Sequence, residues 1–249
     1  PEYLLMMRRS QIISIALSLI AICSALYLVS NRGHPIETEK RAAIIDGLSE
    51  EFPNPELIHS TSDVLRAKGY RVDIYNASAV TVGLYGELPS MGYNLMIIRV
   101  HCAPMDGGNR PGAALFTSEE EPGLYMTEQL LGWVRMARTL TRGDRYYSVT
   151  PAFLREGMKG EFDHTVIILM SCYGCIDDTL AETFIGKGAS TFVGWTGRVT
   201  PEHMDGATSV LLERMLIEGD SISEAVKYTM KEVGVDPNYG SELKAYTAP

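Results

Sequence analysis

Two short apolar segments, each followed by a chemically reactive residue, constrain the fold of this chain most. Leu95–Val100 has the sequence LMIIRV and is followed by His101, and Val166–Ser171 has the sequence VIILMS and is followed by Cys172. Both are rich in β-branched residues and lack polar alternation, which is typical of strands buried on both faces of a parallel sheet. Ligands bind at the carboxyl ends of such strands. If the two strands are neighbours, an imidazole and a thiol lie side by side at one edge of the sheet.

The rest of the chain alternates strand and helix patterns, which is typical of an α/β fold with a mostly parallel sheet. We expect a three-layer α/β/α sandwich around a six-stranded, mostly parallel sheet. Strands are expected at 41–48, 71–77, 95–101, 113–117, 146–149, 166–171, 189–195 and 243–246. Helices are expected at 55–68, 80–88, 127–140, 178–185, 201–218 and 221–233.

The N-terminal part of the sequence differs from the rest. Gln11–Val29 carries no charge and is preceded by Arg8 and Arg9. At 1.5 Å per residue this run is long enough to cross a bilayer core of about 30 Å. We therefore expect a signal anchor or transmembrane helix over residues 1–30, a polar linker over 31–40 and one domain over 41–249. The short basic tail before the run favours a single-pass protein whose body lies outside the cytoplasm.

Charge and cysteine content narrow the function further. The net charge of −9 over 249 residues argues against nucleic acid as a partner. The body of the chain contains Cys102, Cys172 and Cys175. Because this number is odd, at least one thiol is free, and the thiolate of a free cysteine is a strong nucleophile when an imidazole is near.

The segment around Cys172 resembles a known family. It contains VIILMSCYGC at 166–175, then AETF at 181–184, Gly-Ala at 188–189 and FVGW at 192–195. This block is similar to the caspase-fold cysteine peptidases, most closely to their CHAT and gingipain-like branches. In these families an apolar strand ends in a small residue and the nucleophilic cysteine, and the histidine closes the preceding main strand. The resemblance covers roughly residues 41–246 and implies a caspase-like sheet.

The resemblance implies a cysteine endopeptidase that hydrolyses peptide bonds through an acyl-enzyme and needs no cofactor. Cys172 would be the nucleophile and His101 its general acid and base. The backbone N–H groups of Cys102 and Cys172 would form the oxyanion hole. Cys102 occupies the position at which the family usually has glycine. The partners implied are a protein or peptide substrate and, through the N-terminal helix, a membrane.

The resemblance also implies a pocket for the residue before the scissile bond, formed by Asp46, Met170 and the neighbourhood of Trp195. A carboxylate at Asp46 would suit a Lys or Arg side chain, because a guanidinium pairs well with it. Asp46 also fits the role of a turn residue before Gly47, and Trp195 also fits a core position.

Three other interpretations remain open. Cys172-Tyr-Gly-Cys175 is a C-x-x-C motif between a strand and a helix, as in thioredoxin-like redox proteins. His101, Cys102, Cys172 and Cys175 could bind a structural zinc ion if they converged, although we expect no metal. The third alternative is a non-catalytic, membrane-tethered binding or regulatory module with the same fold.

Overall fold

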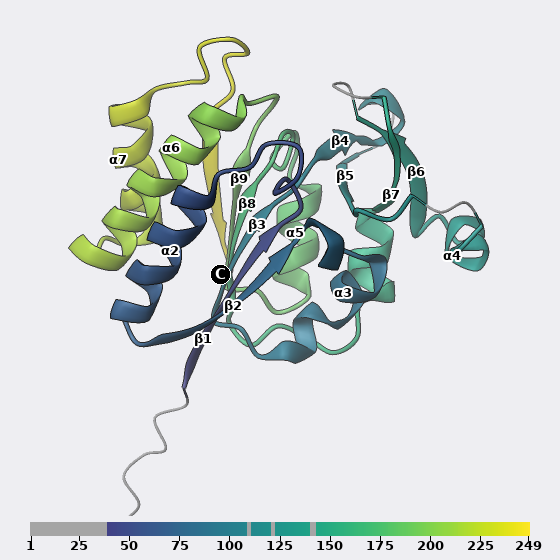
Figure 1. Ribbon diagram of the computed structural model, residues 1–249, viewed down its shortest axis with the longest axis horizontal. Coiled ribbons are helices and arrows are strands. Elements are labelled where there is room, and N and C mark those ends of the chain that lie inside the picture. The colour runs from purple at the N-terminus through teal and green to yellow at the C-terminus, as the bar shows by residue number, and fades with distance from the viewer. Residues whose placement is uncertain (1–38, 109–110, 121–122, 140–142) are drawn as a thin grey trace, which may run out of the picture. The chain divides into compact units, whose positions relative to one another are not determined.

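The computed structural model describes residues 39–108, 111–120, 123–139 and 143–249, which belong to one compact unit, Glu39–Pro249. A six-stranded sheet with the order β10-β9-β8-β3-β1-β2 forms its centre (Figure 1). All neighbouring strands are parallel except the edge strand β10, which is antiparallel to β9. The strands are β1 (Lys40–Asp46), β2 (Tyr70–Asn76), β3 (Leu95–Arg99), β8 (Val166–Met170), β9 (Thr191–Trp195) and β10 (Leu243–Thr247).

Helices cover both faces of this sheet (Figure 1). One face carries α2 (Pro55–Ala67), α6 (Pro201–Leu212) and α7 (Ile222–Val233), with a π-helical turn at Glu213–Glu218 after α6. The other face carries α3 (Val82–Glu87) and α5 (Thr179–Gly186). Short helical turns lie at Ala77–Ala79, Leu88–Met91, Met105–Gly108 and Phe153–Gly157. The expected mixed α/β fold with a mostly parallel six-stranded sheet is therefore confirmed.

Side-chain alternation along the strands divides the core into two layers. On β3, Leu95 and Ile97 face α2, α6 and α7, whereas Met96 and Ile98 face α3 and α5. The same alternation places Arg99 on the side of Leu95 and Ile97, where the guanidinium contacts Asp205 of α6. A charged side chain thus enters an otherwise apolar layer because of its position in the strand period.

A second, four-stranded sheet follows β3 in the chain. Its order is β4-β5-β7-β6, and all of its pairs are antiparallel. The strands are β4 (Cys102–Pro104), β5 (Ala113–Phe116), β6 (Val134–Arg138) and β7 (Arg145–Val149), and the short helix α4 (Met126–Leu130) precedes β6. Because β4 begins directly after His101, this sheet starts at the carboxyl edge of the central sheet.

The helix expected at 127–140 was wrong in most of its length. Helix α4 ends at Leu130, and Gly132 then adopts a left-handed backbone conformation with φ of 71°. From Val134 onward the burial alternates residue by residue, as in a strand with one exposed face. The spacing of apolar residues in this segment fits the period of a helix and that of a strand. The segment forms a strand because β6 pairs with β7.

The expected membrane-spanning run, residues 11–29, lies outside the described residues. Within the described part of the chain, no helix is both long enough and apolar enough to cross a membrane.

Gly188 offers a test of how tightly the turn after α5 is packed. Its φ is +101°, and an added Cβ would overlap the carbonyl group of Phe162. Gly188→Ala should lower the free energy of unfolding by about 3 kcal/mol or more, since both strain and a backbone clash are introduced. The measurement is urea unfolding followed by circular dichroism.

Gly186→Ala is the matched control for this prediction. Gly186 is exposed in the last turn of α5, and an added Cβ would meet nothing within 4 Å. The substitution should leave stability unchanged or raise it by up to about 1 kcal/mol, because alanine favours the helix. Equal effects of the two substitutions would contradict the described turn.

Candidate active site

The pairing of β3 with β8 brings the two reactive residues to the same edge of the sheet. Arg99 lies opposite Met170 in the parallel register, and the N–H of Val100 donates to the carbonyl of Met170 at 3.3 Å. Two residues further along each strand stand His101 and Cys172. Both line one cavity of about 730 Å³ at the carboxyl ends of the strands. The strand adjacency expected from the two apolar segments is confirmed.

His101 is held by a residue that the sequence did not point to. Its Nε2 lies 2.8 Å from a carboxylate oxygen of Glu51, in the loop between β1 and α2. An ionised carboxylate only accepts hydrogen bonds, so this contact assigns a proton to Nε2. The rings of Phe52 and Phe116 lie 6.1 Å and 5.8 Å from the imidazole. The Glu51 carboxylate and the two phenylalanine rings therefore fix the orientation of the imidazole.

The Cys172 thiol contacts a different loop. Its Sγ lies 3.6 Å from the carbonyl oxygen of Val199, and the N–H of Val199 points at the sulfur from 3.5 Å. Among the described residues, no hydrogen bond joins this sulfur to His101. Burial raises the pKa of the Cys172 thiol, and the Val199 N–H and the positive charge of Arg198 only partly offset this effect. The free protein therefore holds Cys172 mainly as the thiol.

The other two cysteines are more deeply buried than Cys172. Cys102 and Cys175 are 7% and 4% exposed and belong to the core layer next to α3 and α5. Cys172 instead packs against the layer next to α2 and α6. Burial raises the pKa of Cys175 to about 12 and that of Cys102 further.

This division of the cysteines bears on two of the alternatives. For the redox alternative, Cys172 and Cys175 are both free thiols, and they pack against different layers of the core. The zinc alternative needs four converging ligands. Within the described ranges, no group of three or more His, Cys, Asp and Glu side chains could hold a metal ion. The geometry supports neither alternative.

The residues expected to form the substrate pocket lie elsewhere. Asp46 is buried, and its carboxylate pairs with the Arg99 guanidinium at 2.9 Å. Burial raises the pKa of Asp46, and the charge of Arg99 opposes this shift. Met170 and Trp195 are buried in the core, at 2% and 1% exposure. None of these three residues lines the cavity that contains Cys172, which argues against a basic-side-chain pocket at Asp46.

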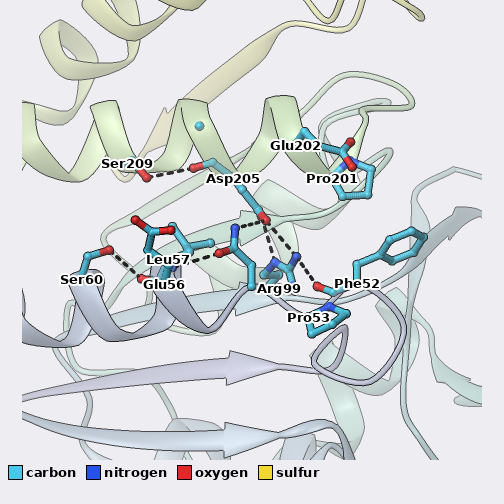
Figure 2. A pocket seen from close by; sticks show the side chains of 12 residues that line it. Phe52, Pro53, Glu56, Leu57, Ser60, Arg99, Pro201, Glu202, Asp205 and Ser209 are labelled. Carbon is cyan, nitrogen blue, oxygen red and sulfur yellow. Dashed lines mark hydrogen bonds and ion pairs between the residues drawn. The ribbon is translucent and has the colours of Figure 1, made fainter.

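Arg99 is the centre of a buried ionic cluster next to a second cavity of about 470 Å³ (Figure 2). Its guanidinium donates to both carboxylate oxygens of Asp205 and to Asp46, each at 2.9 Å. Burial disfavours the charge, but the two carboxylates outweigh this effect and raise the pKa of Arg99. The arginine was visible in the sequence as the one charged residue in an apolar strand, yet its partners come from distant segments.

The charges around the Cys172 cavity are mainly positive. Arg135, Arg138 and Arg198 line it, together with the carboxylates of Asp106 and Glu202. Asp106 is already paired with Arg135. The Arg198 guanidinium lies 4.4 Å from the centre of the Tyr239 ring. It forms no ion pair with any described carboxylate.

The buried carboxylate of Asp236 holds the part of the cavity wall that contains Thr200 and Tyr239. Asp236 accepts hydrogen bonds from the backbone and hydroxyl of Thr200 and from the backbone N–H groups of Asn238 and Tyr239. Burial tends to raise the pKa of Asp236, but these hydrogen bonds outweigh it and lower the pKa. The loop after β9 and the loop before β10 are thereby joined beside Cys172.

Comparison with known proteins adds no assignment to this geometry. No family model matches the chain, and a search of the curated proteins found no match.

The different environments of the three thiols predict different reactivities. Cys172 should react with iodoacetamide at least about 10-fold faster than Cys102 or Cys175, because it alone of the three is not fully buried. Since burial raises its pKa, the rate should still rise above pH 9. Peptide mapping by mass spectrometry over pH 7–10 measures this. Cys172→Ser, in which fast labelling should disappear, is the control, and equal labelling of all three thiols would contradict the placement.

Proposed function

We propose that this protein is a cysteine endopeptidase of the caspase fold, with Cys172 as nucleophile and His101 as general acid and base. One observation carries the proposal: the two residues end adjacent parallel strands, β3 and β8, and line a single cavity. The mostly parallel six-stranded sheet is what the family resemblance implies. The expected anchor at Gln11–Val29 and the extracytoplasmic body remain part of this proposal.

The reaction follows from the placement of the protons. His101 Nδ1 takes the proton of the Cys172 thiol as the sulfur attacks the carbonyl carbon of the scissile peptide bond. The imidazolium, paired with Glu51 through Nε2, then donates a proton to the leaving amine, and an acyl-enzyme remains. Water attacks the thioester after giving a proton to His101, which returns it to the sulfur as the peptide acid leaves.

The backbone at Cys102 supports its role in the oxyanion hole. The Phe116 N–H donates to the carbonyl of His101, and the Met105 N–H donates to that of Gly112. Hydrogen-bonded pairs alternate along an antiparallel ladder, so Cys102 and Leu115 form a pair without mutual hydrogen bonds. The N–H of Cys102 therefore points away from β5. Together with the N–H of Cys172, it can bind the oxyanion.

The contact between Cys172 and Val199 favours the second candidate, a non-catalytic binding or regulatory module that is tethered to a membrane. In such a module the thiol stays bound to Val199. In the peptidase, substrate binding turns the sulfur toward His101. Turnover of a peptide by the folded protein separates the two candidates.

Replacing either reactive residue should abolish cleavage. Cys172→Ala and His101→Ala should each lower kcat/KM for peptide hydrolysis by about 10³-fold or more, because each removes a covalent or proton-transfer step. The measurement uses the full chain and a fluorogenic peptide library. Cys175→Ala should retain activity, since Cys175 lies in the core away from the cavity. Cleavage that persists in Cys172→Ala would contradict Cys172 as the nucleophile. No cleavage of any peptide by the folded native protein would favour the non-catalytic module.

The positive lining of the cavity predicts the substrate charge. We expect acidic side chains to be preferred over Lys or Arg, because the positive charge of Arg198 acts on the Cys172 thiol and Asp46 is already neutralised by Arg99. Arg198→Gln should lower kcat/KM at least about 10-fold for peptides with Glu or Asp before the scissile bond, and less for Gln peptides. Asp46→Asn should leave unchanged the ratio of kcat/KM for the acidic peptides to kcat/KM for the Gln peptides. Equal losses of kcat/KM for the acidic and the Gln peptides in Arg198→Gln would contradict this prediction. A preference of the native protein for Lys or Arg side chains would contradict it as well.

A further inference from the structure

Glu51 lies on a loop that has no strand or helix of its own to hold it. The loop runs from the end of β1 to the start of α2, residues 47–54, and Glu51 is near its middle. A carboxylate can hold an imidazole in one orientation only if its own backbone is fixed. The position of Glu51 therefore depends on what binds the backbone of this loop.

Arg99 binds this backbone directly. Its Nη2 donates to the carbonyl oxygen of Phe52, the residue after Glu51, at 2.8 Å (Figure 2). Its Nη1 donates to Asp46 at 2.9 Å, and Asp46 also accepts the N–H of Leu48. The Arg99 carbonyl accepts the N–H of Gly47 at 2.8 Å. One residue of β3 thus holds both the beginning of the loop and its middle.

Asp205 keeps the guanidinium in the orientation that reaches the loop. It accepts two parallel hydrogen bonds, from Nε and Nη2 of Arg99, each at 2.9 Å. A bidentate pair of this kind fixes the plane of the guanidinium. Asp205 also accepts from the side chain of Asn54, whose oxygen binds the N–H of Leu57 at the start of α2. Both ends of the loop are therefore tied to one buried ion pair.

We propose that Arg99, oriented by Asp205, is the positioning residue that keeps Glu51 against His101. The guanidinium is 1% exposed, so water does not replace its bond to Phe52. The loop carbonyl that it binds is one residue from Glu51, and the Phe52 ring contacts the imidazole edge-on. This inference deepens the proposed function, since it concerns the base of that reaction, but the contact between Glu51 and His101 can be measured without turnover.

The test follows the proton on His101 Nε2 by NMR in the full chain labelled with ¹⁵N-histidine. A proton shared with a carboxylate resonates downfield and exchanges slowly with water. In Glu51→Ala this signal should be lost. Arg99→Lys should cause the same loss or a shift toward it, because one ammonium group cannot reach Phe52, Asp46 and Asp205 together. An unchanged signal in folded Arg99→Lys overturns the inference.

Two further variants keep the test decisive. Arg41→Lys is the matched control: Arg41 pairs with Asp73 at 2.7 Å at the opposite end of β1, and the His101 signal should persist in this variant. If Arg99→Lys does not fold, Asn54→Ser replaces it, since serine preserves the helix cap and lacks the amide group that donates to Asp205. In Asn54→Ser the His101 proton signal should shift in the same direction as in Arg99→Lys, but by a smaller amount. An unshifted signal in Asn54→Ser, or a loss of the signal in Arg41→Lys, overturns the inference.

A double-mutant cycle connects this positioning to reactivity. Arg99→Lys and Glu51→Ala should each slow alkylation of Cys172 by about 5-fold, and the double variant should be no slower than Glu51→Ala. Additive losses would mean that Arg99 acts independently of Glu51, which overturns the inference. Loss of the NMR signal with unchanged alkylation supports the positioning role and counts against His101 as the base of Cys172.

Discussion

The parallel hydrogen-bond ladder between β3 and β8 is the constraint on which the rest of the site depends. It aligns Arg99 with Met170, the last residues of the two strands. Because His101 and Cys172 each follow two residues later in the chain, both lie at the same edge of the sheet. The register also fixes which face each side chain takes. A shift by one residue would place Arg99 among the apolar side chains under α3 and α5, where it would lack both carboxylates.

Arg99 connects β1, the loop after it and α6 at this edge of the sheet. A buried guanidinium is costly unless its donors are satisfied, and breaking such a pair costs about 3–5 kcal/mol. The donors of Arg99 are satisfied by β1, by the loop that follows it and by α6. The same pairing keeps the Asp46 carboxylate in the buried cluster, and Asp46 does not line the cavity that contains Cys172. A carboxylate that the family resemblance assigns to substrate recognition is here part of the scaffold.

The side chains of His101 and Cys172 line the same cavity, but each is bound to its own loop. His101 is fixed by Glu51, and Cys172 contacts the backbone of Val199. Burial favours the neutral thiol. In the proposed peptidase, a bound substrate would turn the sulfur toward His101. The peptidase and the non-catalytic module differ in whether this movement takes place.

The local pattern was sufficient for much of the fold and for the reactive pair. Runs of buried β-branched residues identified β3 and β8, and alternation of strand and helix identified the mostly parallel sheet, because both depend on side-chain periods within a few residues. The same pattern was insufficient at 127–140, where apolar spacing fits a helix and a strand equally. Only pairing of β6 with β7 decided that segment.

The polar contacts of the site could not be read from the sequence, because each joins segments far apart in the chain. Asp205 lies 106 residues from Arg99, and Glu51 lies 50 residues from His101. The sequence determined that an imidazole and a thiol would stand at the ends of two buried strands. Only the tertiary structure decided which carboxylates serve the site, because hydrogen bonds to Asp46, Glu51 and Asp205 depend on distances that strand pairing and helix packing create.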